Sequence, residues 1–287
     1  MTNKQALLLG VAVGLAAVAF AIVGLRGPEP EAPTIVRVVQ ASDVEWGHLN
    51  PLRGDKSPRA GTLWGSRQTP VPSGFLVKFV DGFSSPPHIH PVTYRGVVLG
   101  GEVHNDVPTA PEVWLPVGSF WTQPAGEVHI TAARGDENVA YIEIEKGPYL
   151  VKPVEDAFEP DEKPAKLGEK DMDWVDAPGQ PASGDGPKIA ALPDNPHDEQ
   201  LRRALIKLPP GFDGSVRSQG STLHAVVVRG RPQHEVPGET NGTTLEPGSY
   251  CGSEGTGAHH VSCAAGEECV IYVRTLGAFN VIAAPAE

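Results

Sequence analysis

The chain repeats itself, and this duplication limits its fold more than any other feature of the sequence. Residues Leu76–Phe83, LVKFVDGF, match Leu205–Phe212, LIKLPPGF, at four of eight positions with an offset of 129. Farther along, His129–Glu143 matches His260–Arg274 at six of fifteen positions with an offset of 131. Because the order is kept and the offset changes by only two residues, two copies of one structural unit explain the pattern.

The duplication predicts two domains of similar size. The first copy covers about residues 40–151 and the second about residues 172–284, which divides a chain of 287 residues into units of ordinary domain length. The stretch 152–171 between them is rich in Pro, Glu, Asp and Lys. Such a composition predicts a solvated linker.

Each copy has the pattern of short β-strands. Phe75–Val80, Tyr94–Leu99 and Val139–Ile144 in the first copy, and Ala225–Val228 in the second, are rich in β-branched or alternating apolar residues. Turn signals such as Asp81-Gly82 separate them, and the chain contains 33 Gly and 29 Pro. No amphipathic helical pattern follows residue 34, so we expect an all-β protein with one antiparallel barrel or sandwich in each copy.

The amino-terminal segment is expected to be a targeting signal and not to form part of the barrels. Residues Ala6–Leu25 form an uncharged apolar stretch that is long enough for a membrane-spanning helix, and Lys4 precedes them. This pattern favours an uncleaved signal-anchor over a cleaved signal peptide, with 27–34 as an extended tether. The sequence therefore predicts an exported protein, either periplasmic or anchored in the inner membrane and facing the periplasm. Membrane contact is expected through this segment only.

Charge and cysteine content indicate which binding partners and which covalent cross-links to expect. The chain has 23 basic and 35 acidic residues, a formal charge of −12, which disfavours binding to nucleic acid. The three cysteines are too few for a disulfide scaffold. Cys263 and Cys269 bracket a short turn, so the sequence leaves open whether they form a disulfide or stay reduced.

Three histidines in the first copy form a candidate metal site. Alternate residues of a strand face the same side, so His88 and His90 direct two imidazoles to one point. His129 follows a Pro-x-Gly turn that would bring a second hairpin alongside. Neutral imidazole is a ligand for Zn, Fe, Cu and Ni. The alternative is a pair of surface histidines on an exposed strand.

These residues carry a resemblance to the cupin superfamily. Its first motif has Gly, five residues, His-x-His, three or four residues, Glu, six residues and Gly, and residues 82–101 reproduce this spacing with Tyr94 in place of the Glu. Its second motif is matched by Gly118, Pro124, Gly126 and His129, with Ala133 in place of an Asn. More narrowly, the chain is similar to a group of bacterial bicupins related to the cupin domain of a zinc-binding anti-sigma factor.

The resemblance implies a fold and a chemistry. Each copy would be a jelly-roll barrel, a double-stranded β-helix, and His88, His90 and His129 would bind one divalent metal inside the first barrel. Three histidines without the Glu leave coordination positions open, as in cupin dioxygenases. An oxygen-using metalloenzyme acting on a small organic molecule is therefore expected, with Fe(II) favoured and Zn, Mn, Ni or Cu as alternatives. Cupins often pair through sheet edges, which leaves a homodimer open.

Tyr94 is the candidate catalytic residue. It replaces the missing Glu and should share the inward face with the histidines, where it would donate a hydrogen bond to bound oxygen or to an enolate. A packed core tyrosine is the alternative. Two other functions remain open: a sensing or binding module without turnover, and an isomerase in which Tyr94 serves as acid or base. Weaker site candidates are Glu102, His104, Gln123, Glu127 and Trp121.

The second copy is expected to have lost the metal site. The sequence places Arg217, Gln219 and Leu223 at the positions of His88, His90 and Tyr94, and His260 at the position of His129. Arg has no electron pair for a metal, and Gln is a poor ligand for a soft ion. The second copy would then be a structural partner, or a pocket that binds an anion through Arg217.

Overall fold

The computed structural model of the chain describes residues 35–178, 184–194, 197–235 and 242–284. The apolar stretch 6–25 and the tether lie outside the described residues, so the signal-anchor stays a prediction. Among the residues that the structure describes, no helix is long and apolar enough to cross a membrane. The short helices there are 3₁₀ turns: η1 (Ala41–Asp43), η2 (Pro51–Lys56), η3 (Val154–Asp156) and η4 (Glu169–Asp171).

The first repeat is a barrel built on two long strands. The two halves of β9 (Ile130–Ile144) bond to different neighbours, since Val139 to Ile144 lie beside β4 while Ala132 and Ala133 lie beside β5. The strands of the first barrel run in the order β10-β8-β6-β9-β4-β3-β2, with β5 paired to β9 and β7 paired to β6. The other bounds are β2 (Gly47–His48), β3 (Arg59–Gly65), β4 (Ser73–Phe79), β5 (Phe83–Ser84), β6 (Tyr94–Asp106), β7 (Leu115–Pro116), β8 (Phe120–Gln123) and β10 (Ala165–Leu167).

The second repeat is a barrel of two sheets. One has the order β1 (Ile35–Val39), β18 (Tyr250–Glu254), β15 (Thr222–Arg229), β20 (Cys269–Leu276), β13 (Leu201–Leu208), β12 (Lys188–Ala191) and β11 (Trp174–Asp176). The other has the order β17 (Thr243–Thr244), β16 (Gln233–Glu235), β19 (Ala258–Ser262), β14 (Asp213–Ser218) and β21 (Phe279–Ala283). The expected all-β class with two tandem barrels is confirmed.

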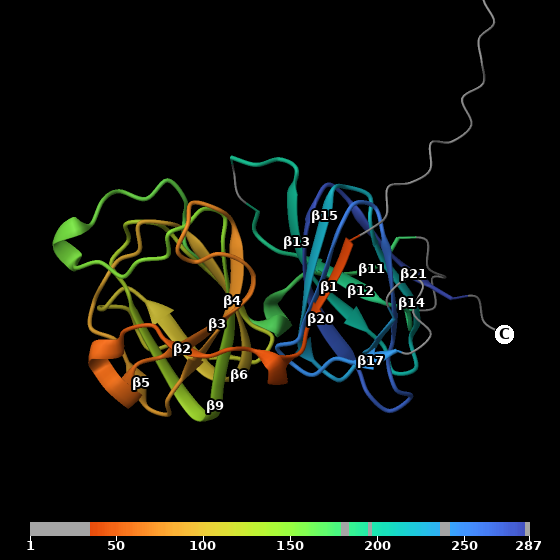
Figure 1. The fold of residues 1–287 in the computed structure, drawn as a ribbon, viewed down its shortest axis with the longest axis horizontal. Coiled ribbons are helices and arrows are strands. Elements are labelled where there is room, and N and C mark those ends of the chain that lie inside the picture. Colours follow the sequence, from red (N-terminus) through yellow and green to blue (C-terminus); the bar gives the residue numbers. More distant parts are fainter. Residues whose placement is uncertain (1–34, 179–183, 195–196, 236–241, 285–287) are drawn as a thin grey trace, which may run out of the picture. The chain divides into compact units, whose positions relative to one another are not determined.

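The repeats exchange strands. β1 precedes the first barrel in the chain yet pairs with β18 of the second, where Figure 1 shows it in red. In the corresponding place, β10 precedes the second barrel and pairs with β8 of the first. The stretch between the repeats, 152–171, therefore contributes a strand to the first barrel. In each barrel, one strand is therefore paired with a strand from the segment that leads into the other barrel.

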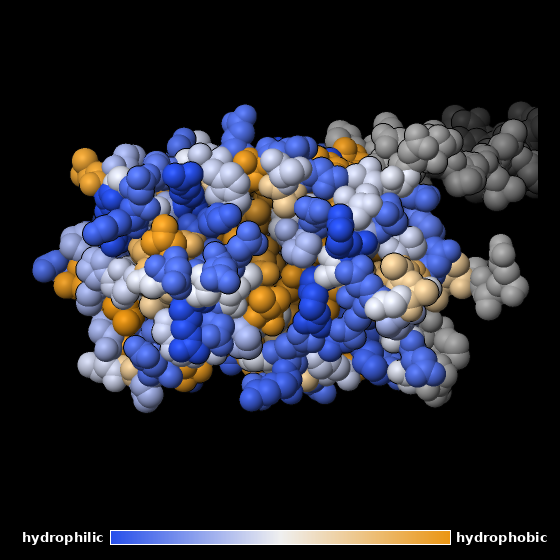
Figure 2. Space-filling view, turned by 90° about the horizontal axis from the view of Figure 1, so that it is seen from below, coloured by the Kyte–Doolittle hydropathy of each residue, from blue (hydrophilic) through white to orange (hydrophobic). Residues whose placement is uncertain are grey.

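Period-two alternation in the strands divides the apolar residues between three cores. On β4, Phe75 and Val77 belong to the core inside the first barrel, whereas Leu76 joins a cluster built from both repeats. On β13, Ile206 faces the interior of the second barrel and Leu205 joins the shared cluster. The surface in Figure 2 is largely hydrophilic, with hydrophobic residues gathered near the middle of the view. The sheets that contain β4 and β13 thus bury both faces, one inside the barrel and one against the other repeat.

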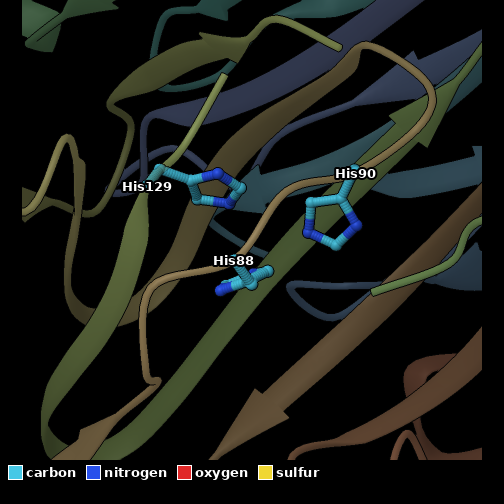
Figure 3. A group of neighbouring side chains, drawn as sticks. All are labelled: His88, His90 and His129. Atoms are coloured by element: carbon cyan, nitrogen blue, oxygen red, sulfur yellow. The ribbon is translucent and has the colours of Figure 1, made fainter. Parts of the chain in front are cut away.

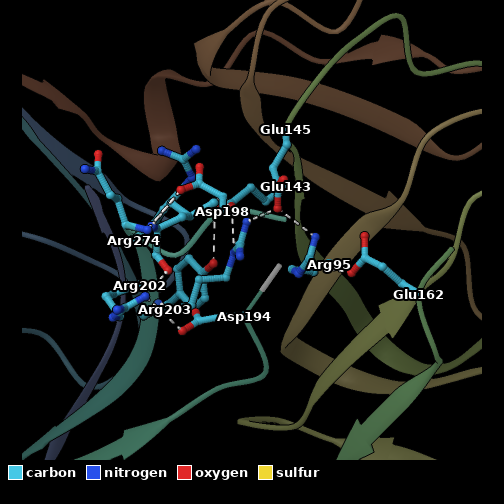
Figure 4. A network of polar contacts seen from close by, with 12 residues as sticks. Arg95, Glu143, Glu145, Glu162, Asp194, Asp198, Arg202, Arg203 and Arg274 are labelled. Carbon is cyan, nitrogen blue, oxygen red and sulfur yellow. Dashed lines mark hydrogen bonds and ion pairs between the residues drawn. The ribbon is translucent and has the colours of Figure 1, made fainter. Parts of the chain in front are cut away.

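A buried carboxylate joins the two repeats. Glu143 of β9 is 1% exposed and accepts hydrogen bonds from Arg203 Nε at 2.9 Å and from Arg274 Nε at 3.1 Å. The hydroxyls of Tyr272, at 3.0 Å, and Tyr141, at 3.2 Å, donate to its other oxygen. Figure 4 shows Arg203 and Arg274 of the second repeat close to this carboxylate. Two cations and two hydroxyls offset the cost of removing the charge from water.

Candidate metal centre

The loop between β5 and β6 brings two histidines alongside a third by backbone pairing. His88 and His129 exchange both backbone hydrogen bonds, each 3.0 Å long. The next residue, Ile89, exchanges its backbone bonds with Lys152 on the other side and buries its side chain completely. Extended backbone therefore alternates His88, Ile89 and His90 between opposite faces, so the two imidazoles share one side.

The three imidazoles meet inside the first barrel. One ring nitrogen from each of His88, His90 and His129 lies within 4.8 Å of the other two. The ring centroids are 4.4 Å apart for His88 and His129, 5.0 Å for His88 and His90, and 5.3 Å for His90 and His129. All three side chains are buried, and Figure 3 shows the rings grouped around a common space. Separate segments of chain thus converge on one point.

Backbone carbonyls hold all three rings in the same tautomer. Nδ1 of His88 lies 2.9 Å from the Pro86 carbonyl oxygen, and Nδ1 of His90 lies 2.7 Å from that of Leu150. Nδ1 of His129 lies 3.1 Å from the Glu127 carbonyl oxygen. A carbonyl only accepts, so each Nδ1 carries the proton and donates it. Each Nε2 then keeps its electron pair, which is how metal-binding histidines are oriented in proteins.

Burial keeps these rings neutral. It lowers the pKa of His129 to about 3, with the nearby His88 as a second cause. Burial also lowers the pKa of His90 well below its usual value, again with its two histidine neighbours contributing, and lowers that of His88. Since protonated imidazole cannot bind a metal, neutral rings are the form that a metal site needs. The donor set fits a borderline divalent cation with three imidazole ligands.

A cavity of about 590 Å³ lies next to the histidines. Its walls are mainly apolar and include Phe79, Trp121 and Ile142, and His88, His90 and Tyr94 also line it. Among the described lining residues, Arg53 is the one cation, and no carboxylate lines the space. A volume of this size accommodates a small organic molecule.

Tyr94 lies at this cavity, on the same side as the histidines. Its hydroxyl is 3.5 Å from His129 Nε2 and donates to Asn105 Oδ1 at 2.8 Å. Asn105 Oδ1 also accepts from Thr131 Oγ1 at 2.8 Å, and Asn105 Nδ2 donates to Gln123 Oε1 at 2.7 Å. Burial raises the pKa of Tyr94 above its usual value. The tyrosine therefore stays protonated, with its proton directed to Asn105 and an oxygen electron pair left over.

Sequence reasoning missed two residues of this site. Tyr149 places its hydroxyl 3.3 Å from His90 Nε2 and stacks its ring on that of His90 with centroids 4.4 Å apart. It follows the last strand of the repeat, where no motif marks it. Asn105 was missed because it is eleven residues beyond Tyr94, an odd spacing that predicts opposite faces. Register shifts between Val98 and Gly100 and between Gly100 and Glu102 interrupt the alternation of side chains, so Asn105 faces the same side as Tyr94.

The weaker candidates separate into two groups. Gln123 and Glu127 extend the polar network, since Gln123 Nε2 donates to Glu127 Oε2 at 3.1 Å, and burial raises the pKa of Glu127. Glu102 instead forms an ion pair with Arg134 at 2.6 Å. His104 Nδ1 lies 3.1 Å from the Val113 carbonyl oxygen. Neither Glu102 nor His104 lines the cavity or belongs to the histidine group.

The second repeat differs from the expected alignment by one residue. Arg217 and Gln219 are exposed, whereas their neighbours Val216 and Ser218 are buried. A shift of one residue moves a side chain to the other face of a strand. The expectation that Arg217 lies in the barrel, as a metal-site equivalent or an anion ligand, is wrong.

The same shift applies to the histidine pair. His259 is 1% exposed, while His260 lies outside and pairs with Asp213 at 2.9 Å. The prediction that His260 holds the position of His129 is therefore wrong, and His259 holds it. Leu223 does occupy the position of Tyr94. Leu223 pairs with Thr275 and Tyr94 pairs with Ile144, and these two partners are equivalent residues of the two repeats.

Comparisons with known proteins agree with this architecture. The model of a family described as a domain of unknown function, DUF4437, matches residues 37–282. No curated protein matches the chain significantly. A solved structure from Nostoc punctiforme, named as a candidate dioxygenase, has 14% sequence identity and a TM-score of 0.61, covering 88% of this chain and 87% of that one.

Two further structures are similar at the same level. Salicylate 1,2-dioxygenase from Pseudaminobacter salicylatoxidans has 16% identity and a TM-score of 0.58, covering 90% of this chain and 91% of that one. A variant of oxalate decarboxylase from Bacillus subtilis has 12% identity and a TM-score of 0.56, covering 89% and 82%. At these identities the likeness concerns the fold. The chain has the cupin fold in both repeats and belongs to the DUF4437 family.

Proposed function

We propose that the protein is a metal-dependent cupin enzyme that uses oxygen on a small organic substrate. The observation that carries this proposal is the shared orientation of His88, His90 and His129, whose Nδ1 atoms donate to carbonyls while one ring nitrogen of each lies within 4.8 Å of the other two. Fe(II) is the favoured ion, with Zn, Mn, Ni and Cu as alternatives. When bound, the metal would supply a Lewis acid with open coordination positions for substrate and dioxygen.

The chain's own residues would bind and orient the substrate. The apolar walls formed by Phe79, Trp121 and Ile142 would hold a flat or branched apolar body and exclude water. Arg53 would pair with an anionic group, since it is the cation among the described lining residues. A small aromatic or aliphatic carboxylate fits this combination. The likeness to a salicylate 1,2-dioxygenase supports that class.

Tyr94 would position the substrate by accepting a hydrogen bond. Its proton is directed to Asn105, so its oxygen can accept from a substrate hydroxyl beside His129. This differs from the donor role that the sequence suggested. A buried tyrosine with a raised pKa is unsuited to act as a base, which counts against the isomerase alternative.

Metal analysis tests the site directly. The full chain, purified without added ions, is compared with His88→Ala and His129→Ala, and with His260→Ala as an exposed control. We expect each of the first two variants to lose one equivalent of metal and His260→Ala to lose none. Unchanged metal content in both cavity variants would rule out the assigned ligands.

Oxygen uptake distinguishes an enzyme from a binding module. Iron-loaded protein is supplied with aromatic and aliphatic carboxylates, phenols and diketones, and consumption of oxygen is followed. Uptake that is absent in His129→Ala supports the enzyme. Tight binding of one of these compounds without any uptake supports the alternative, a sensing module without turnover.

Export is a second part of the proposal, and it rests on the amino-terminal sequence alone. The finer relation to the cupin domain of a zinc-binding anti-sigma factor likewise stays a prediction. Fractionation of cells that express the full chain, with and without residues 1–34, tests export. Recovery of both forms in the cytoplasm would contradict it.

A further inference from the structure

Three metal-binding side chains also meet inside the second barrel. His234 of β16, Cys251 of β18 and His259 of β19 each offer one donor atom, and these atoms lie within 4.8 Å of one another. The three residues are 1%, 7% and 1% exposed. They come from both sheets of the barrel, so the fold assembles the group. Nothing in the motif spacing of the first repeat predicts it, since Trp121 and Asn105 hold the places of Cys251 and His234.

One electron pair in this group has no partner. His234 Nε2 lies 2.9 Å from His259 Nδ1, and His259 Nε2 lies 2.8 Å from Ser253 Oγ. If His234 Nε2 donates to His259 Nδ1 and His259 Nε2 donates to Ser253, both bonds are satisfied and both nitrogens of His259 are used. The remaining nitrogen, His234 Nδ1, is buried without a hydrogen-bond partner among the described residues. Buried polar atoms are rarely left in this state, which points to a ligand that accepts electron pairs.

The space beside these atoms fits a single ion. A cavity of about 20 Å³ is lined by all three residues, and its other lining residues are apolar, among them Val216, Leu223 and Ile271. This is enough volume for one water-sized particle and far too little for an organic substrate. No carboxylate is among the lining residues that the structure describes.

Charge balance in this apolar space favours a thiophilic ion. Cys251 supplies the sulfur donor of the group, and it lines the cavity together with apolar side chains. A thiolate with one imidazole suits Cu(I), which favours soft sulfur ligands, and with Cu(I) the group carries no net charge.

We propose that the second barrel holds its own thiophilic metal ion, Cu(I) in preference to Zn²⁺, bound by His234 and Cys251, with His259 orienting the His234 ring through their hydrogen bond. The site is closed and would stabilise the barrel instead of binding substrate. The proposal does not depend on the function of the first barrel. It predicts that the full chain binds two metal ions of different chemistry, one in each repeat.

The test uses the full chain, stripped of metal and titrated with Cu(I) and, separately, with Zn²⁺ against a competing chelator. We expect a tight equivalent that Cys251→Ser removes and His88→Ala retains. Cys263→Ser is the matched control, because Cys263 is an equally buried thiol outside the group. Circular dichroism of Cys251→Ser checks that the barrel is folded, and His234→Gln provides a second variant that should also lose the ion.

Substitution with Co²⁺ gives a readout of the sulfur ligand. A thiolate-to-cobalt charge-transfer absorption that is present in the wild type and in His88→Ala, and lost in Cys251→Ser, supports the proposal. Loss of this absorption in Cys263→Ser instead, or the same number of tight equivalents in Cys251→Ser and wild type, would overturn it. Tighter binding of Zn²⁺ than of Cu(I) would overturn the choice of ion.

Discussion

Glu143 and Arg274 occupy the same position in the two repeats and bind each other, with Arg274 Nε 3.1 Å from Glu143 Oε1. The offset between them is 131, as it is between Tyr141 and Tyr272, whose rings also meet with centroids 5.2 Å apart. Equivalent surfaces of the two barrels therefore face each other, as in an isologous dimer. At this position one copy supplies a carboxylate and the other supplies its counter-ion.

Removing this carboxylate should destabilise the fold severely. Glu143→Gln leaves Arg203 and Arg274 without the buried counter-charge, and breaking a buried pair on one side costs about 3–5 kcal/mol. Urea unfolding measures the loss. Glu102→Gln is the control, because the ion pair of Glu102 with Arg134 is exposed and should contribute about 1 kcal/mol at most. Equal effects of the two substitutions would refute the role of Glu143.

Gly74 permits the close packing of Trp64 on Tyr141. A Cβ at residue 74 would lie 2.1 Å from Trp64 Nε1 and 2.4 Å from the Tyr141 hydroxyl, which hydrogen-bond to each other at 3.1 Å. Gly74→Ala should therefore lower the free energy of unfolding by about 1–3 kcal/mol. Gly47→Ala is the control, since nothing lies within 4 Å of its Cβ. Thermal unfolding of both variants checks this, and matching melting temperatures would contradict the packing argument.

Acid should weaken the contacts of Glu169. Hydrogen bonding to Arg229, the largest cause, lowers the pKa of Glu169 to about 2 from 4.5, and Lys207 adds to the effect. The unfolded state then binds more protons between pH 4.5 and 2, so this contribution is complete above pH 4.5 and is lost as the pH falls toward 2. The carboxylate is partly exposed, so the loss should be about 1 kcal/mol or less. Urea unfolding of wild type and Glu169→Gln across this range should give curves that converge at low pH; parallel curves would contradict the assignment.

Tyr94→Phe should separate positioning from metal binding. The substitution removes the hydroxyl that lies beside His129 and bonds to Asn105, while Asn105 Oδ1 still accepts from Thr131. Metal content should stay at the wild-type level, and kcat/KM with any substrate found by oxygen uptake should fall by roughly 10-fold, the value of one hydrogen bond to a neutral group. Metal loss in Tyr94→Phe would instead make Tyr94 part of the metal shell, and unchanged kinetics would make it a packing residue.

Much of this protein could be read from its sequence. The constant offset between the repeats predicted two barrels because a duplicated pattern of strands and turns specifies the same local structure twice. Alternation predicted that His88 and His90 share a face, which depends only on the geometry of extended backbone. These inferences hold because they rest on neighbours within a few residues along the chain.

Tertiary structure decided the rest. The bulges in β6 that bring Asn105 to Tyr94, and the register that buries His259 instead of His260, depend on pairing between distant strands. A shift of one residue reverses every side chain, and a sequence pattern does not resolve it when both neighbours are histidines. The exchange of β1 and β10, the salt bridge of Glu143 and the meeting of His234, Cys251 and His259 likewise join residues far apart in the chain. Only the closure of each barrel and the packing of the two barrels against each other bring such residues together.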